Sequence, residues 1–171
     1  MAFVDLVLLG DVDGNVLNGG NGADRISGND GDDIINGGGG NDIVLGGKGM
    51  DYIRGGNGSD TLYGGLGDDF LLGGSGADFL SGDAGSDSLT GGQGADVFAF
   101  NVNVASLGTG VDLVHDFVVG EDLIKIVNGS NSLVSFVDQG SSLGMYYDGQ
   151  KIAALLNVHV VPDDLGVFFA A

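Results

Sequence analysis

A period of nine residues constrains the fold of this chain more than any other feature of its sequence. Nine blocks follow one another in register from Gly19 to Ala99; positions one and four are always Gly, position six is always Asp, and position eight is always a large apolar residue. A fixed period repeated this often is typical of a solenoid. Each block joins a Gly-rich hexamer to a three-residue apolar run, which predicts a tight turn followed by a short strand. Two blocks then complete one coil, and stacked coils form two parallel sheets.

The position-eight residues are predicted to fill the space between the two sheets, because alternate residues of a strand face opposite sides. They are Ile26, Ile35, Val44, Ile53, Leu62, Leu71, Leu80, Leu89 and Phe98. Side chains at positions seven and nine then face outward, among them Tyr52, Tyr63, Phe70, Leu72 and Phe79. We predict an outer surface that is most apolar in the later blocks and that calls for a partner or a cap.

The position-six aspartates are predicted to lie in two columns, because alternate blocks stack on the same edge of the coil. One column holds Asp24, Asp42, Asp60, Asp78 and Asp96, and the other holds Asp33, Asp51, Asp69 and Asp87. Carboxylates about 5 Å apart repel one another by about 1 kcal/mol in water and by about 3 kcal/mol at an effective dielectric constant of 20. No Lys or Arg recurs at this spacing to neutralise them, so we predict bound divalent cations. Carboxylates together with the carbonyls of Gly-rich turns favour Ca²⁺ over Mg²⁺.

The consensus of the blocks, GGxGxDxUx, resembles the calcium-binding nonapeptide of the RTX, or hemolysin-type, proteins. The resemblance implies an all-β fold: a right-handed parallel β-roll, that is a two-sheet solenoid, followed by a C-terminal β cap as in secreted RTX proteases and alginate epimerase R-modules. It also implies about seven or eight Ca²⁺ ions, each held between two stacked loops. In each pair the lower loop would supply the carbonyls of positions two and four, the upper loop those of positions one and three, and both loops their Asp.

This arrangement implies a definite set of carbonyl ligands. In the first column they are Gly20, Gly22, Gly37 and Gly39; then Gly38, Gly40, Gly55 and Asn57; then Gly56, Gly58, Gly73 and Ser75; then Gly74, Gly76, Gly91 and Gln93. In the second column they are Asn29, Gly31, Gly46 and Lys48; then Gly47, Gly49, Gly64 and Leu66; then Gly65, Gly67, Gly82 and Ala84. Two blocks depart from the consensus, with Asn29 and Asp83 at position two, which leaves the carbonyl ligand in place but puts the loop conformation in question.

The segment before the repeats, residues 1–18, is predicted to be an apolar strand followed by a degenerate capping repeat. The spacing of Asp11, Asp13 and Asn15 resembles the start of an EF-hand loop, but Gly22 stands where the bidentate Glu would be, so we reject an EF-hand. Asp11 and Asp13 remain candidates for an additional metal site. Terminal repeats are usually atypical, which favours a cap.

The segment after the repeats, residues 100–171, is predicted to form the β cap, since it alternates apolar or β-branched runs with turn residues. The stretch DLVHDFVVGEDLI resembles the sequence that follows the repeats in secreted RTX proteases and epimerase R-modules. Asp116, Glu121 and Asp122 either close a further calcium site or are turn carboxylates in solvent, and both interpretations stay open. The final residues, Asp163–Phe169, resemble the uncleaved type I secretion signal of that family, and an edge strand of the cap is the alternative.

Composition excludes several classes of function. The formal charge is −19, from 24 acidic and five basic residues, so no basic patch is present for nucleic acid. Seven Ca²⁺ ions would bring the charge to about −5. The absence of cysteine excludes disulfides and thiolate metal sites. The N-terminal residues lack the basic region of a secretory signal, and no apolar run is long enough for a transmembrane helix.

We therefore expect a non-catalytic, extracellular or cell-surface calcium-binding module of a secreted bacterial RTX protein, whose partners are Ca²⁺ and the type I secretion machinery. His115 and His159 are expected to be structural, and no HExxH or GxSxG motif is present. The carboxylate pairs Asp32/Asp33 and Asp68/Asp69 could mimic a glycosidase dyad, but the second Asp of each is the expected metal ligand. Two alternatives stay open: a module that binds an alginate-like polysaccharide, and a self-assembling surface or matrix protein.

Overall fold

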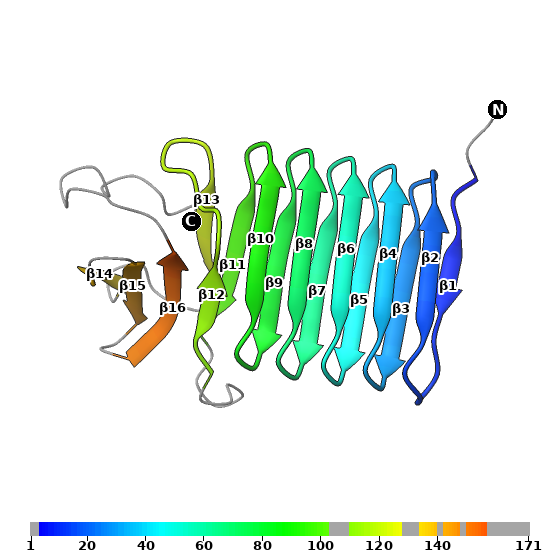
Figure 1. Cartoon of the computed structure of the whole chain (residues 1–171), viewed down its shortest axis with the longest axis horizontal. Coiled ribbons are helices and arrows are strands. Elements are labelled where there is room, and N and C mark those ends of the chain that lie inside the picture. The colour runs from blue at the N-terminus through cyan, green and yellow to red at the C-terminus, as the bar shows by residue number, and fades with distance from the viewer. Residues whose placement is uncertain (1–3, 103–109, 128–133, 140–141, 148–149, 157–171) are drawn as a thin grey trace.

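The fold is all-β, as the repeats predict. The computed structural model describes residues 4–102, 110–127, 134–139, 142–147 and 150–156. Its strands form a parallel solenoid of two facing sheets (Figure 1), with the N-terminus at one end and the C-terminal strands at the other. The strands of the seven-stranded sheet, in spatial order, are β1 (Val7–Leu9), β3 (Arg25–Asp30), β5 (Ile43–Lys48), β7 (Thr61–Leu66), β9 (Phe79–Ala84), β11 (Val97–Asn101) and β13 (Leu123–Val127).

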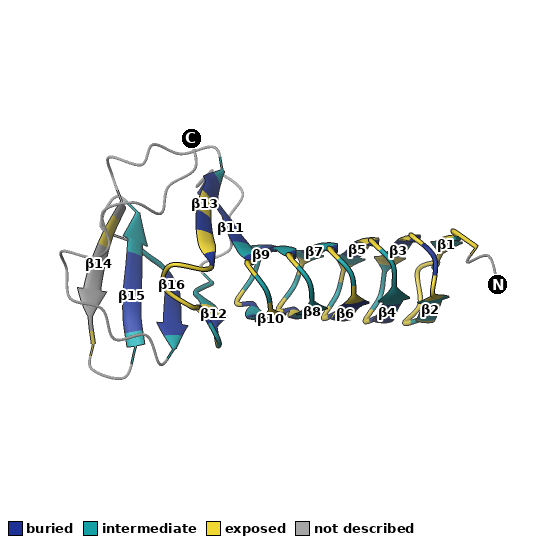
Figure 2. Cartoon of the chain, turned by 90° about the horizontal axis from the view of Figure 1, so that it is seen from above, coloured by how far each residue is buried: buried dark blue, intermediate teal, exposed yellow. Residues whose placement is uncertain are grey.

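The second sheet has nine strands. In spatial order they are β14 (Val134–Asp138), β15 (Ser142–Tyr147), β16 (Gln150–Leu156), β12 (Asp112–Val114), β10 (Ser88–Gln93), β8 (Phe70–Ser75), β6 (Tyr52–Asn57), β4 (Ile34–Gly39) and β2 (Val16–Gly20). From β1 to β13, odd-numbered and even-numbered strands therefore separate into the two layers of the roll, as Figure 2 shows from above.

The repeat strands are longer than the sequence predicts. Each of β3 to β10 has six residues rather than three, because the parallel ladder runs on from the apolar residues through positions one to three of the next block. Glycine pairs with glycine in this extension, for example Gly38 with Gly56 and Gly56 with Gly74. Within the repeats, paired residues are 18 positions apart in the sequence, so each position of a block lies above the same position two blocks earlier.

The position-eight residues form the core of the roll, as predicted. All nine are at most 2% exposed, and they pack in one continuous cluster with Val114, Phe117 and Ile124. Burying one such side chain contributes roughly 1.5–3 kcal/mol. The core thus consists of one row of side chains per sheet, and the turns at either edge must hold the stacked coils in register.

The outer surface is most exposed at the N-terminal end, which differs from the prediction. Val7, Leu9 and Val16 are 72%, 71% and 68% exposed, against 48% for Phe70. β1 and β2 are edge strands with a neighbour on one side only, so nothing covers these side chains laterally. Phe79 is half-buried, because Tyr63 packs against its ring at a centroid distance of 5.7 Å and the Lys125 ammonium lies 5.6 Å from its centroid.

Beyond the repeats, β12 and β13 continue the two sheets in parallel, whereas β14, β15 and β16 pair antiparallel. These strands agree with the strands and turns predicted for this region. The final predicted segment, Asp163–Phe169, and His159 lie outside the described residues. No helix that could cross a membrane occurs among the residues that the structure describes.

Candidate metal centre

The nine position-six aspartates lie in two columns, one along each edge of the roll, and hydrogen bonds connect each column. The Oδ1 atom of each Asp accepts a hydrogen bond from a backbone N–H one coil below. The donor is Leu6 for Asp24, Asn15 for Asp33 and an Asp for the other seven. In the first column Asp24 N donates to Asp42 Oδ1 at 2.7 Å and Asp42 N donates to Asp60 Oδ1 at 2.8 Å. The second column repeats the pattern, with Asp51 N donating to Asp69 Oδ1 at 2.8 Å. The predicted stacking is confirmed.

The second oxygen of these carboxylates has no hydrogen-bond partner. Eight Oδ2 atoms are buried and unpaired: those of Asp24, Asp33, Asp42, Asp51, Asp60, Asp69, Asp78 and Asp87. A buried polar atom without a partner costs roughly 1–3 kcal/mol, and more when it is charged. Eight of them together rival the entire stability of a typical domain, about 5–15 kcal/mol. A ligand that satisfies these oxygens is therefore needed to stabilise the ionised roll.

Backbone carbonyls line the same spaces. A Cβ added to Gly19 would clash with both Asp24 Oδ2 and the carbonyl oxygen of Gly37 in the coil above, and the same holds at Gly55 for Asp60 Oδ2 and the Gly73 carbonyl. Glycine at position one thus keeps a narrow gap open between a carboxylate oxygen and a carbonyl oxygen of adjacent coils. An oxygen-only environment that includes carboxylates and carbonyls is the donor set that Ca²⁺ prefers.

Two carboxylates at most face each gap between coils. Among the described residues no group of three or more His, Cys, Asp or Glu side chains is close enough to hold a metal ion by itself. A cation in these gaps would therefore need backbone carbonyls as well as carboxylates, which is what the glycine-lined gaps offer.

Burial makes these carboxylates resist ionisation when no cation is present. Burial raises the pKa of Asp60 to about 6, and the nearby charges of Asp78 and Asp42 add to the effect. Burial likewise raises the pKa of Asp69 to about 7 and that of Asp96 to about 6. The hydrogen bond from the backbone N–H below lowers the pKa of each group, but burial outweighs it. Protons and cations would therefore compete for the carboxylates of such a column.

The two blocks that depart from the consensus keep the loop conformation. Asn29 and Asp83 have φ values of +79° and +69°, in the left-handed region that Gly20 and Gly38 also occupy at position two. Asn and Asp tolerate this region better than other non-glycine residues. The hydroxyl of Ser81 donates to Asp83 Oδ1 at 2.7 Å and holds the side chain in place. The question raised by the sequence is thus resolved in favour of an unchanged loop.

Sequence reasoning missed a second set of hydrogen bonds, made by polar side chains at position five. Asp32 Oδ1 accepts from Met50 N at 2.8 Å, Asn41 Oδ1 accepts from Ser59 N at 2.9 Å, and Asp68 Oδ1 accepts from Ser86 N at 2.8 Å. These bonds reach upward to the next coil, whereas the position-six bonds reach downward. The signal was present in the sequence, because position five is Asp, Asn or Ser in five of the nine blocks. Such residues bond to nearby backbone groups in turns.

The other predicted site residues lie at the two ends of the roll. Asp116 accepts hydrogen bonds from Gly91 N and Gly92 N, and Asp122 accepts from Asp96 N and Val118 N. Both are therefore caps of backbone groups in this structure.

At the opposite end, Asp11 Oδ1 accepts from Asp13 N and from the Asn15 amide. The hydrogen bond from the Asp13 backbone, followed by that from Asn15, lowers the pKa of Asp11. Glu121 is exposed. The structure does not bring Asp11 or Asp13 onto either column of repeat aspartates by a hydrogen bond.

His115 lies on the outer face of the second sheet, where its Nε2 is 2.7 Å from Ser88 Oγ. A Ser–His pair acts in nucleophilic catalysis when an acid orients the histidine. Within the part of the chain that the structure describes, no carboxylate is hydrogen-bonded to His115. The pair is exposed.

The repeats match a family of known proteins. A family model of the RTX calcium-binding nonapeptide repeat matches four times, over residues 9–44, 37–71, 45–80 and 72–101. The chain belongs to the RTX calcium-binding repeat family. These matches together span residues 9–101, more than half of the sequence, and they support a calcium-binding structural module. No curated protein sequence is significantly similar to the chain.

Two solved structures are similar to this RTX chain. One is the extracellular lipase LipA from Serratia marcescens, at 17% identity and a TM-score of 0.38, covering 96% of this chain and 40% of the lipase. The other is the AlgE6R3 subunit of the Azotobacter vinelandii mannuronan C5-epimerase, at 22% identity and a TM-score of 0.35, covering 94% of this chain and 80% of that subunit. The chain thus spans less than half the length of the lipase.

Proposed function

We propose that this chain is a calcium-dependent folding module of a secreted bacterial RTX protein, and that it has a structural rather than a catalytic role. The observation that carries the proposal is the set of eight buried, unpaired aspartate oxygens that face glycine-lined gaps between coils. The paired position-six aspartates hold the Ca²⁺ ions, together with the loop carbonyls that the family resemblance assigns. Residues 1–18, 19–99 and 100–171 act as N-terminal cap, roll and C-terminal cap.

Calcium then decides whether the roll folds. Without the ion, ionised aspartates stack in columns with unpaired buried oxygens, and the chain has 24 acidic residues against five basic ones. Cytosolic Ca²⁺ is too scarce to fill sites with the roughly 0.1–1 mM affinities of extracellular modules. Ion binding outside the cell supplies the folding free energy. This suits export of an unfolded chain through type I secretion machinery, followed by folding outside the cell.

Circular dichroism of the full chain tests this proposal. We expect coil-like spectra in excess chelator and recovery of β signal when Ca²⁺ is added back. A chelated sample at neutral pH that keeps its β spectrum and its melting temperature would refute the calcium-folding mechanism.

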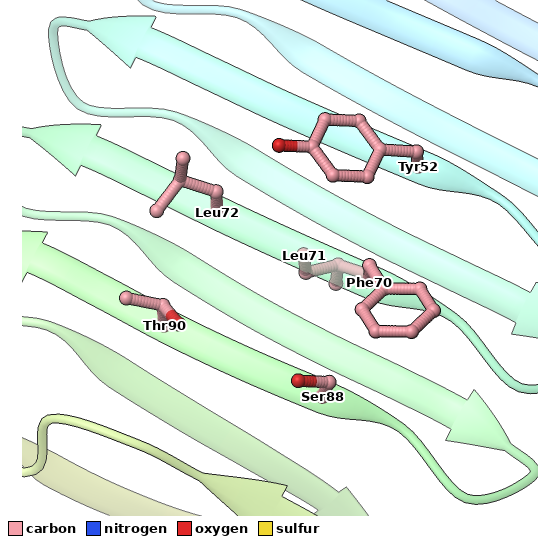
Figure 3. A pocket seen from close by; sticks show the side chains of 6 residues that line it. All are labelled: Tyr52, Phe70, Leu71, Leu72, Ser88 and Thr90. Carbon is pink, nitrogen blue, oxygen red and sulfur yellow. The ribbon is translucent and has the colours of Figure 1, made fainter.

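A second candidate function, binding of a polysaccharide, is favoured by one surface. Tyr52, Phe70, Leu71, Leu72, Ser88 and Thr90 line a shallow depression on the outer face of the second sheet, where the rings of Tyr52 and Phe70 stand on neighbouring strands (Figure 3). Tyr52 and Phe70 are 51% and 48% exposed. Exposed rings beside hydroxyl groups form a surface on which sugar rings can stack.

Calcium-loaded protein passed over agarose and alginate columns tests this surface, with Tyr52→Ala/Phe70→Ala as the variant. A matched control is Ile34→Ala/Ile43→Ala, which also removes two exposed apolar side chains from the repeats. Retention that the first variant loses and the second keeps supports polysaccharide binding. Light scattering that rises with protein concentration, without retention on either column, favours self-assembly instead.

A further inference from the structure

Two blocks of the roll begin with nearly the same sequence around an Asn-Gly pair. Residues 19–24 read GGNGAD and residues 55–60 read GGNGSD, so Asn21 and Asn57 both occupy position three, and Gly22 and Gly58 both occupy position four. Both asparagines are exposed. A difference in reactivity between the two pairs must therefore come from the fold and not from the neighbouring residues in the sequence.

The backbone of Gly58 is held by the coil above it. Its N–H donates to the Ser75 carbonyl at 2.8 Å, and every position-four glycine from Gly31 to Gly76 makes the equivalent hydrogen bond. The φ of Gly58 is +123°, and all position-four glycines from Gly31 to Gly94 have φ between +106° and +147°. The nitrogen of Gly58 is thus part of a ladder that is released only when the interior coils separate.

Gly22 differs from these glycines in both respects. It does not have a positive φ. Among the residues that the structure describes, its N–H has no backbone acceptor, although the equivalent acceptor would be the Gly39 carbonyl in the coil above. Gly22 is buried, and a Cβ on it would clash with the backbone of Val4 below. The first Asn-Gly pair therefore lacks the bond and the conformation that fix the second pair.

An Asn-Gly pair can react with itself, because glycine has no Cβ to obstruct the approach of its nitrogen to the asparagine side chain. The glycine nitrogen attacks the side-chain carbonyl carbon of asparagine, a C–N bond forms, and the side-chain amide leaves as ammonia, which carries away the glycine N–H proton. Water then opens the resulting succinimide to aspartate or isoaspartate. In isoaspartate the main chain runs through the former side chain and is one methylene longer.

We propose that Asn21 is a deamidation site of the folded roll, and that isoaspartate formed there weakens the first Ca²⁺ site. The reacting carbon belongs to an exposed side chain, and the attacking nitrogen of Gly22 does not have to leave a backbone hydrogen bond. At Asn57 the same reaction requires the bond from Gly58 to Ser75 to break first.

The effect on calcium rests on the proposed function, in which the carbonyls of Gly20 and Gly22 bind the first ion together with Asp24 and Asp42. Asn21 lies between these two glycines in the sequence. An additional methylene at this point moves Gly22 relative to Gly20, so that the two carbonyls no longer face the same gap.

Peptide mapping of the full chain tests the site. Protein that is loaded with Ca²⁺ and folded by circular dichroism is incubated at mildly alkaline pH, and tandem mass spectrometry follows each asparagine over time. We expect Asn21 to convert at least about fivefold faster than Asn57, the factor that corresponds to one backbone hydrogen bond. In denaturant with chelator the two rates should be equal, because the flanking residues match.

The rate comparison uses the unchanged protein, so no variant has to fold. Equal rates in the folded protein, or faster conversion of Asn57, would overturn the proposal. A preference for Asn21 that persists unchanged in denaturant would also overturn it, because the cause would then be the sequence and not the fold.

Native mass spectrometry of the incubated samples tests the effect on calcium. We expect chains with isoaspartate at position 21 to bind one Ca²⁺ fewer than unincubated protein, and the variant Asn21→Gln, which closes the ring far more slowly, to keep its full number of ions. Chains with isoaspartate that keep every ion would overturn this half of the proposal. Unincubated protein that binds no Ca²⁺ would overturn the proposed function instead, and the rate comparison would stand.

Discussion

Removal of a central aspartate should destabilise the calcium-loaded roll more than removal of the first aspartate of the same column. Asp60 stands between Asp42 and Asp78, so its carboxylate is shared by two gaps between coils. Asp24 has Asp42 above it but Leu6 below it, and the Leu6 backbone N–H donates to Asp24 Oδ1. We compare Asp60→Ala with Asp24→Ala, two substitutions that remove the same group from equivalent positions.

The magnitude follows from what each carboxylate does. Both variants lose one charge-assisted hydrogen bond from a backbone N–H, about 1.5–3 kcal/mol in either case. Each bound ion adds RT ln(1 + [Ca²⁺]/Kd), about 1.4 kcal/mol when free Ca²⁺ is tenfold above Kd. Asp60→Ala weakens two ions and Asp24→Ala weakens one. The expected difference between the variants is therefore about 1.4 kcal/mol at that calcium concentration, because the hydrogen-bond contribution cancels.

Calcium titrations followed by circular dichroism measure the effect, with urea unfolding at fixed free Ca²⁺ as a second measurement. Asp30→Ala is a matched control, since the Asp30 side chain is 47% exposed and, among the described residues, its carboxylate pairs only with Lys48 at 2.9 Å. An exposed pair of this kind contributes at most about 1 kcal/mol. Equal calcium midpoints for Asp60→Ala and Asp24→Ala would show that ions are not shared between stacked coils, and the reasoning would fail.

Three further outcomes are expected. Magnesium should not refold the chelated protein at concentrations where Ca²⁺ has already saturated its refolding, because the gaps between coils offer carbonyls and little room for the waters that Mg²⁺ retains. Equal refolding by the two ions in a circular dichroism titration would contradict this. Burial raises the pKa of Asp60 to about 6 and of Asp69 to about 7 from 3.8, so the metal-free fold loses stability as pH rises from about 4 through 7. Chelated protein should thus show more β signal in circular dichroism near pH 4.5 than near pH 8. Calcium affinity should rise over the same range of pH. A chelated spectrum that does not change with pH would contradict the expected loss of stability. Asn41→Ala should raise the calcium concentration at the folding midpoint, since it removes the hydrogen bond from Ser59 N. Ala77→Asn should lower that concentration by adding the equivalent hydrogen bond. Midpoints that shift in the same direction in both variants would contradict a role for position five.

The period of the sequence was sufficient to predict the architecture, because each repeat position has one physical role. Position eight needs apolar volume and fills the core, and position six needs a carboxylate and forms the columns. Strand length could not be predicted in the same way. A Gly-Gly-x segment has low strand propensity, yet stacking of identical coils pairs its backbone, and the ladder extends through it.

The sequence does not reveal that the second column of hydrogen bonds continues past the nonapeptides, where Asp87 N donates to Asp112 Oδ1. Asp112 follows Asp87 by 25 residues, whereas stacked aspartates of the repeats are 18 residues apart, so a fixed period does not include residues 110–115. The family resemblance points to Asp116 and Asp122, but which of their oxygens are hydrogen-bonded depends on where the loop 116–122 runs. Spacing alone does not encode that path. The outward faces were also misjudged, because exposure at β1 and β2 follows from their place at the sheet edge rather than from their composition.

The chain contains its own comparison for why position six is Asp. Asn15 takes this place in the degenerate repeat, one coil below Asp33, and its N–H donates to Asp33 Oδ1 at 2.7 Å like any other member of the column. Its own Oδ1 accepts from Asp11 N at 2.8 Å, and its amide nitrogen donates to Asp11 Oδ1 at 3.2 Å. Asparagine thus satisfies both side-chain atoms from within the protein, whereas aspartate at the same place leaves one oxygen to be satisfied by a cation. Every block from Asp24 to Asp87 has the carboxylate and its unpaired oxygen. Under the proposed function, replacing an amide by a carboxylate at this position turns a self-sufficient turn into one whose stability depends on the ion.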